Sequence, residues 1–506
     1  MFVNHCPLTL PASLRIILAS LVLTLATASA AAQTAPLKKL QELTHKGARV
    51  SALVIDLDHK RVLSELEPDL RLTPASVSKL FITAAALEQW GPDSVFTTRF
   101  SSGAQIKDGV LGGDLMLVGA GDPDLDSERL WLLITRLRQA GVRTISGDLI
   151  INDYLFGPVI CLITDRCEAR NVSDNAYDAP LSAAGVNFSS IELSILPSDT
   201  PGEPASLQLL PPTLAGVTID GTIETVARNA AASYAVRRVT KFGEHTLHVK
   251  GQVPAGAGAI HVQRSVAYPS RYTGSILARM LADSGISVEG ITRVDSNPPP
   301  EDFRTVAEVQ SPALAQQLRK MMAYSNNYMA DTLTLNMLAY SDVPGPLTLP
   351  LAAQRLEAFA TNVNAREYAW DNRKENKETP LILDSGSGLS VTNRLSARDV
   401  VSLLAYMYRQ NANFPAFLGS LPVPLHAPSR SLKSGNIQWL TRVAVKTGSL
   451  SEPISVRALA GYIRLETGGW GAFAVIVNGS KAKRRIPFYT ANGAIIADIE
   501  SILARY

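Results

Sequence analysis

Residues 74–92 read PASVSKLFITAAALEQWGP, and this stretch decides how the chain is organised. A proline opens the run, strong helix formers fill its second half, and Gly91-Pro92 is a helix stop signal. The pattern predicts a helix over residues 76–90, with Ser76 at its start and Lys79 one turn further on. Positions i and i+3 of a helix share a face, so the Ser76 hydroxyl and the Lys79 amine can come within hydrogen-bonding reach.

The pair Ser76 and Lys79 predicts nucleophilic catalysis. A serine hydroxyl is a poor nucleophile until a neighbouring base takes its proton, and a helix N-terminus adds N–H groups that help form an oxyanion hole. Lys79 must be neutral to act as that base, whereas a free lysine titrates near about 10.4, so burial or a nearby cation has to lower its pKa. Taken alone, a Ser-x-x-Lys string more often marks an ordinary helix start with a solvated lysine.

A second string, Ser325-Asn326-Asn327, strengthens the prediction. It lies at the joint between two predicted helices, over residues 313–324 and 328–340. At such a joint Ser325 can relay a proton, while Asn327 can bind a substrate carbonyl and orient the lysine of the first motif. A helix cap is the structural alternative. A similar string, Ser173-Asp174-Asn175, lies in a polar loop without a predicted helix beside it, and we favour the later copy.

The third string, Lys446-Thr447-Gly448, ends a strand-like run. Lys446 and Thr447 can bind a terminal carboxylate, and Gly448 leaves room for a substrate backbone. Lys446 is also a cation that could lower the pKa of the first lysine, and the N–H of Ser449 can join the oxyanion hole. Two partial copies of the motifs, at Lys433-Ser434-Gly435 and at residues 480–483, are interpreted as a turn and a solvated loop.

The composition is that of a globular protein without an evident charged partner. Of 506 residues, 46% are hydrophobic and 18% charged, enough for a large core and, by length, about three domains. A net charge of +3 is too small to indicate nucleic acid. We expect no metal and no cofactor, because His245 and His248, three apart on a predicted strand, point to opposite faces.

The first 32 residues predict a secretory signal peptide. An apolar run over residues 16–25 follows two basic side chains, and small residues fill positions 26–32. The run is too short to span a bilayer comfortably, so we expect the mature chain to be soluble after export. In an oxidising compartment Cys161 and Cys167 are expected to close a small disulfide loop, with free thiols as the alternative.

The remaining sequence alternates between β-like and helical texture. Before the first motif, two strands of a hairpin are predicted. Between the motifs, residues 96–300 read as a largely β insertion, with residues 272–285 as its one helix. Residues 367–379 read as a charged surface loop, and further strands precede a C-terminal helix at 491–505. The predicted strands outside the insertion cover residues 50–57, 62–66, 442–445, 456–463 and 472–477.

With the three strings in this order, the chain resembles the low-molecular-mass class C penicillin-binding proteins, the D-alanyl-D-alanine carboxypeptidase/endopeptidase family. The resemblance covers most of the mature chain. It also includes Gly119-Ala120-Gly121-Asp122-Pro123, Tyr177-Asp178-Ala179-Pro180 and Gly386-Ser387-Gly388-Leu389-Ser390. The chain departs from the family pattern at Asn326, where Asp is frequent, and at Ser385 and Ser449.

The resemblance implies an α/β transpeptidase-like catalytic domain, formed by residues 33–95 and 300–506, with an antiparallel sheet flanked by helices. Residues 96–299 would form two smaller, mostly β domains inserted between the first and second motifs. It implies Ser76 as the acylated nucleophile and Lys79 as its base, with Ser325 in proton relay. Substrate binding would fall to Asn327, Lys446 and Thr447.

The activity implied is that of a serine D-Ala-D-Ala carboxypeptidase and endopeptidase acting on peptidoglycan peptides, with β-lactam antibiotics as inhibitors. A β-lactamase or an esterase using the same site is one alternative. A peptidoglycan-binding protein without activity is another. Weak membrane association and the oligomeric state are left open by the sequence.

Overall fold

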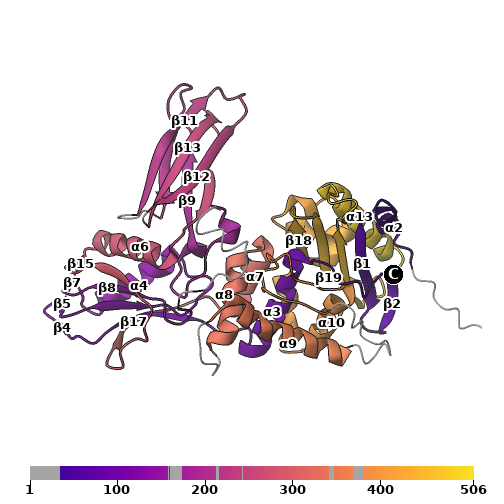
Figure 1. The fold of residues 1–506 in the computed structure, drawn as a ribbon, viewed down its shortest axis with the longest axis horizontal. Helices are drawn as coiled ribbons and strands as arrows, with labels where there is room; N and C mark the ends of the chain where they lie inside the picture. Colours follow the sequence, from indigo (N-terminus) through magenta and orange to yellow (C-terminus); the bar gives the residue numbers. More distant parts are fainter. Residues whose placement is uncertain are drawn as a thin grey trace, which may run out of the picture.

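The computed structural model describes residues 35–506 apart from 158, 160–173, 212–215, 242, 341–346 and 368–379. The predicted signal peptide, Cys161, Cys167 and nearly all of the charged loop therefore lie outside the described residues. The described chain forms a sheet-and-helix body, built from both ends of the sequence, and a separate group of sheets built from its middle (Figure 1). None of the described helices is long and apolar enough to cross a membrane.

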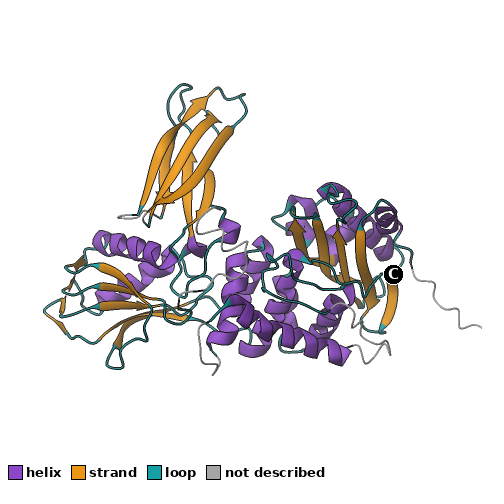
Figure 2. Cartoon of the chain, viewed as in Figure 1, coloured by secondary structure: helices purple, strands orange, loops and turns teal. Residues whose placement is uncertain are grey.

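A five-stranded antiparallel sheet is the centre of the body. Its two N-terminal strands pair with three strands from the C-terminal end of the chain, so the sheet joins residues more than 400 positions apart. This arrangement confirms the expected fold class of an antiparallel sheet flanked by helices (Figure 2). In spatial order the strands are β18 (Val443–Leu450), β19 (Val456–Arg464), β20 (Trp470–Asn478), β1 (Arg49–Asp56) and β2 (Arg61–Leu66).

Both faces of this sheet are covered by helices. Side chains of a strand alternate between faces, and in β20 Phe473, Val475 and Val477 pack under α2 (Lys38–His45) and α13 (Phe488–Leu503). The intervening Ala472, Ala474 and Ile476 face the other group of helices. Two covered faces explain why β20 reads as a nearly continuous apolar run rather than an alternating one.

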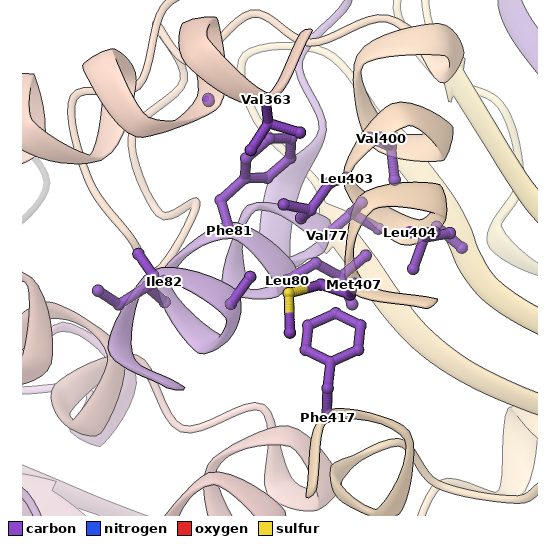
Figure 3. Packing of buried hydrophobic residues seen from close by; sticks show 14 of the residues in the cluster. Val77, Leu80, Phe81, Ile82, Val363, Val400, Leu403, Leu404, Met407 and Phe417 are labelled. Atoms are coloured by element: carbon purple, nitrogen blue, oxygen red, sulfur yellow. The ribbon is translucent and has the colours of Figure 1, made fainter. Parts of the chain in front are cut away.

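Helix α3 (Lys79–Trp90) runs through the middle of the larger helical layer. Its first nine residues are all buried, as expected for a helix that is apolar on every side. Figure 3 shows Leu80 and Phe81 packed among side chains from neighbouring helices, such as Leu403 and Phe417. The helices around it are α7 (Leu314–Tyr324), α8 (Asn327–Ala339), α9 (Leu349–Glu367), α10 (Ala397–Tyr408) and α11 (Phe414–Ser420).

The middle of the chain forms separate sheets with cores of their own. One core lies between β-strands and two helices, α4 (Ser127–Gln139) and α6 (Pro269–Asp283). The prediction of a single helix in this region, at 272–285, was therefore wrong. Helix α4 was missed although Asp126 caps it and Leu130, Leu133, Ile134 and Leu137 follow helical spacing.

The strands of this region are mostly short. The first core includes a five-stranded sheet of β3 (Thr97–Ser102), β6 (Leu115–Val118), β8 (Leu149–Asn152), β16 (Thr292–Asp295) and β17 (Arg304–Gln310). A second sheet consists of β4 (Ile106–Lys107), β5 (Val110–Leu111), β7 (Thr144–Ile145) and β15 (Ser287–Val288).

A taller pair of sheets projects away from the body in Figure 1. It contains β9 (Ser190–Leu196), β10 (Ser206–Leu210), β11 (Val217–Val226), β12 (Ser233–Lys241), β13 (Glu244–Pro254) and β14 (Ile260–Ser265).

The middle region leaves and rejoins the body at one place. Strands β3 and β17 are antiparallel neighbours, and Thr97 lies opposite Gln310. The chain therefore passes from β17 to α7 next to the place where it entered β3. Because the two connections lie side by side, more than 200 residues can be accommodated without separating α3 from α7 and α8.

A buried ion pair fixes the segment that leads to Ser76. The guanidinium of Arg71 donates to both carboxylate oxygens of Asp399, at 2.9 and 3.1 Å, and both side chains are buried. Asp399 also completes the capping box of α10 with Ser396. This contact ties the residues before α3 to the N-terminus of α10.

We predict that Arg71→Met destabilises the fold by about 3 kcal/mol, because it leaves a buried carboxylate without its cation. Scanning calorimetry would measure this as a lower melting temperature. Arg61→Met is the matched control: the Arg61 side chain is 47% exposed and lies 3.7 Å from Asp56, so its loss should cost less than about 1 kcal/mol. Equal shifts in the two variants would contradict the prediction.

Candidate active site

The predicted nucleophile and base lie next to each other. The Nζ atom of Lys79 is 3.0 Å from the Oγ atom of Ser76. Ser76 lies in a short 3₁₀ turn, Ala75–Ser78, and α3 begins only at Lys79, so the helix starts later than predicted. The two side chains still share one face, because residues three apart eclipse each other in a 3₁₀ turn.

The amine of Lys79 is held by three oxygen atoms from different parts of the chain. Besides Ser76 Oγ, it donates to Asn327 Oδ1 at 2.6 Å and to the carbonyl oxygen of Ser387 at 2.6 Å. These contacts come from three parts of the chain and fix the position of the amine beside the Ser76 hydroxyl. Lys79 is fully buried, whereas Ser76 is partly exposed.

The second motif contacts the third through Ser325 and Lys446. Ser325 ends α7 in the left-handed conformation, with φ of 54°, which turns its side chain out of the helical path. Its Oγ atom accepts a hydrogen bond from Lys446 Nζ at 2.8 Å, and the same amine donates to the carbonyl oxygen of Thr447 at 2.7 Å. Burial lowers the pKa of Lys446, and the positive charges of Lys79 and Arg457 lower it further.

Strand β18 carries the whole Lys-Thr-Gly string and continues to Leu450, so the motif does not end the strand as predicted. The absence of a side chain at Gly448 is a steric requirement. A Cβ atom there would lie 2.6 Å from the carbonyl oxygen of Pro74 and 3.2 Å from the nitrogen of Ser76. This close approach brings the backbone of Ser449 alongside the turn that carries the nucleophile.

Asn478 and Gly388 both contact the segment that forms the turn carrying Ser76. The side-chain amide of Asn478 accepts from the N–H of Thr73 and donates to its carbonyl oxygen, both at 3.0 Å. Ala75 adopts a φ of 49°, a conformation that side chains disfavour and that persists only where surroundings enforce it. Gly388 packs so closely that a Cβ atom would lie 1.9 Å from the carbonyl oxygen of Ala75.

The string at residues 386–390 contacts Lys79 through the carbonyl oxygen of Ser387. Asp331, fully buried in α8, accepts from the N–H of Ser387 at 2.8 Å, which orients the Ser387 carbonyl group toward the lysine. Asn393 bridges this string to the first motif: its side-chain amide donates to Ser385 O and to Ser78 Oγ, both at 3.1 Å. The sequence identified the string by resemblance alone, and its contact with Lys79 was not predicted.

An open cleft of about 660 Å³ lies over these groups. Its walls include residues of the first and second motifs, Ser449 next to the third, and Asp174 and Asn175 of the polar loop whose string was not favoured as the second motif. Asn327 donates to the backbone carbonyl of Tyr177 at 3.0 Å. The sequence of that loop did not predict that it lies beside Asn327, although Tyr177-Asp178 belongs to one of the strings shared with the family. The lining residues are Ser76, Asp174, Asn175, Tyr177, Asp178, Ser325, Asn327, Gly388, Leu389, Val391 and residues 449–452.

Four of the eight predicted site residues line this cleft: Ser76, Ser325, Asn327 and Ser449. Lys79 and Lys446 contact Ser76 and Ser325, respectively. Thr447 and Gly448 lie between Lys446 and Ser449 on β18. The two partial copies lie elsewhere: Lys483 is exposed, and Lys433 lies in a turn. Among the described residues, no group of three or more His, Cys, Asp or Glu side chains is arranged to hold a metal ion. The groups gathered here suit proton transfer to and from a serine and the binding of an anionic substrate.

Comparison with known proteins identifies the family of the chain. The D-Ala-D-Ala carboxypeptidase 3 (S13) family matches residues 35–487. The chain belongs to this family. The match includes both halves of the central sheet, the cleft and the inserted region.

Individual relatives cover nearly the same extent. A D-alanyl-D-alanine carboxypeptidase of Actinomadura sp. (strain R39) is 29% identical over 87% of this chain and 79% of its own length. The D-alanyl-D-alanine carboxypeptidase DacB of Haemophilus influenzae is 25% identical over 88% of this chain and 90% of its own. The crystal structure of penicillin binding protein 4 (dacB) from Haemophilus influenzae matches the fold with a TM-score of 0.71, at 21% identity, over 92% of this chain and 99% of that one.

We predict that Gly388→Ala slows reaction of Ser76 with fluorescent penicillin at least about 100-fold. The new methyl group must displace the backbone of Ala75, and small displacements at a reacting atom are costly. Gly493→Ala is the control, because a Cβ atom at this helical position meets no atom within 4 Å. Gel fluorescence over time measures both variants, and an unchanged rate in Gly388→Ala would contradict the packing argument.

We also predict that Lys446→Met makes the protein more stable at neutral pH while removing its activity. Burial lowers the pKa of Lys446 in the folded chain, so the unfolded chain binds this proton more tightly. The free energy of unfolding of the wild type therefore rises as the pH approaches 10.5, the ordinary pKa of a lysine. The variant should gain about 1–2 kcal/mol at pH 7, and the gain should shrink by pH 9.5. Melting temperatures at the two pH values test this, and a less stable variant at pH 7 would contradict it.

Proposed function

We propose that this member of the D-Ala-D-Ala carboxypeptidase family cuts peptidoglycan stem peptides through an acyl-enzyme at Ser76. The observation that carries the proposal is the 3.0 Å contact between Ser76 Oγ and the buried amine of Lys79, at the base of an open cleft. A lysine in this position can take the hydroxyl proton as the oxygen attacks a carbonyl carbon.

Acylation would begin with attack of Ser76 Oγ on the carbonyl carbon of the penultimate D-Ala. The backbone N–H groups of Ser76 and Ser449 would stabilise the negative charge on the carbonyl oxygen. Collapse of the tetrahedral intermediate breaks the C–N bond, and the leaving amine takes a proton from Ser325, which is 2.8 Å from Lys446. The proton that Lys79 took from Ser76 replaces it through this relay, so that Lys79 is neutral again. The terminal D-Ala then leaves, and an ester remains on Ser76.

Deacylation would return the enzyme to its starting state. A water molecule entering the open cleft attacks the ester carbon and gives a proton to the neutral Lys79 amine. Lys79 passes this proton to Ser76 Oγ as the ester C–O bond breaks. Asn327 would hold the substrate while its own Oδ1 keeps Lys79 in place. A β-lactam ring offers the same carbonyl and amide nitrogen, so it would acylate Ser76 in the same way.

Two further properties belong to this proposal. The cleavage of D-Ala to diaminopimelate cross-links uses the same bond type, and we propose it as a second activity. The signal-peptide pattern, together with a cell-wall substrate, supports a periplasmic location. A digest of purified muropeptides analysed by mass spectrometry would measure how the two activities are balanced.

We predict that fluorescent penicillin labels wild-type protein at Ser76 and that Ser76→Ala removes both the label and the release of D-Ala. Removal of an attacking hydroxyl commonly costs a factor of about 10⁴ or more in turnover. Peptide mapping locates the label. Ser480→Ala is the matched control, because it alters the other Ser-x-x-Lys string and should leave labelling unchanged.

A label retained in Ser76→Ala would overturn the assignment of the nucleophile. Rapid turnover of nitrocefin without release of D-Ala would instead support the β-lactamase alternative. Muropeptide binding without release of D-Ala would support a binding protein.

A further inference from the structure

A second cavity, of about 620 Å³, lies at the end of β18 opposite to Ser449. None of its described lining residues belongs to the active-site cleft. Its walls come from α7, from the end of α11 with the loop that follows, and from the ends of β18, β19 and β20. Ala323 and Ala444 line it, and they precede Ser325 and Lys446 by two residues each. The cavity is therefore separate from the cleft but close to it.

The described residues that line this cavity include three arginines and one histidine but no acidic residue. They are Arg319 of α7, His426 in the loop after α11, Arg442 directly before β18 and Arg464 at the end of β19. None of the three arginines forms an ion pair with a described carboxylate. Because like charges gathered without counter-ions repel one another, an anion that enters the cavity would be attracted to it.

Two of these guanidinium groups are held in place without any ligand. Arg442 Nε donates to the carbonyl oxygen of Arg464 at 2.7 Å, whereas the buried Nη2 atom of Arg442 has no hydrogen-bond partner among the described residues. The Arg464 guanidinium lies over the ring of Trp470, 5.0 Å from its centroid. Trp470 is packed edge-on against Phe414 and Tyr462. Fixed groups lose little freedom when a ligand binds, which favours binding.

The other walls of the cavity indicate what kind of anion fits. A guanidinium group pairs with a carboxylate or a phosphate through two parallel hydrogen bonds. Beside the arginines the lining includes Leu418, Leu421 and Val443, so the ligand should carry apolar groups next to its charge. Stem peptides of peptidoglycan combine alanyl methyl groups with several carboxylates, whereas an inorganic phosphate offers charge alone.

We propose that this cavity is a second binding site, which takes a carboxylate-bearing stem peptide of peptidoglycan while another stem peptide is cut at Ser76. Such a site would hold the polymer beside the cleft and raise the local concentration of the peptides to be cut. The identity of the ligand rests on the proposed function, but the binding of an anion in the cavity does not.

The test measures binding by a chain whose cleft is blocked. After acylation of Ser76 by penicillin, calorimetric titration with a disaccharide-tripeptide muropeptide reports sites outside the cleft. The acylated wild type should bind it, and more weakly as salt is added. The double variant Arg442→Gln/Arg464→Gln should bind at least about tenfold more weakly. Arg319→Gln, at an exposed position, should also weaken binding, and this change leaves the packing of Trp470 intact.

Arg485→Gln is the matched control, because Arg485 is exposed, is paired with Glu452 and lines a different cavity. Its binding should equal that of wild type. Binding that disappears on acylation would place the muropeptide in the cleft, and equal binding by wild type and the double variant would place it elsewhere, so either result would overturn the inference. Tighter binding of inorganic phosphate than of the muropeptide would overturn the assignment of the ligand.

Failure of the proposed function would give a different result. Penicillin would then not acylate Ser76, and the same titrations on the unmodified wild type and its arginine variants would still decide whether the cavity binds an anion.

Discussion

The hydrogen bonds of the Lys79 amine are the interaction on which the rest of the structure depends. They join the turn before α3, the joint between α7 and α8, and the string around Ser387, which come from positions about 250 and 310 residues apart. No single segment of the chain could both bury the Lys79 amine and fix its orientation. The sheet and the helical layer must both assemble first, and the paired β3 and β17 let the inserted region enter and leave without disturbing them.

This arrangement buries several basic side chains near one another, and burial of a charged group costs desolvation free energy. Lys79, Lys446 and Arg457 are all buried. Burial lowers the pKa of both Lys446 and Arg457, and the charges of Lys79 and Arg457 lower that of Lys446 further. A core built only for stability would replace them with apolar side chains. Their presence is understandable if the carboxylate of the substrate supplies a negative charge and if proton transfer needs a neutral amine. The chain would then be less stable at the active site than an apolar core would make it, in return for function.

Much of this could be predicted from the sequence. The hairpin, α3, the Ser325 joint and the C-terminal strands follow strong periodicity and stop signals, and the order of three motifs indicated one cleft. Helix α4 was missed because short β-like runs surround it. The contributions of Asp174 and Tyr177 to the cleft could not be seen, because they depend on contacts between sheets and loops distant in sequence. Gly388 could be identified as part of a string, but its contact with Ala75 arises only from packing.

The most direct test of the account is a crystal structure of the chain after reaction with a penicillin. The account predicts an ester bond from Ser76 Oγ to the opened lactam, with Lys79 Nζ still within hydrogen-bonding distance of that oxygen. It also predicts that the carboxylate of the antibiotic lies at the Lys446 and Thr447 end of the cleft. An acyl group on another residue, or a Lys79 side chain turned away from Ser76, would contradict it.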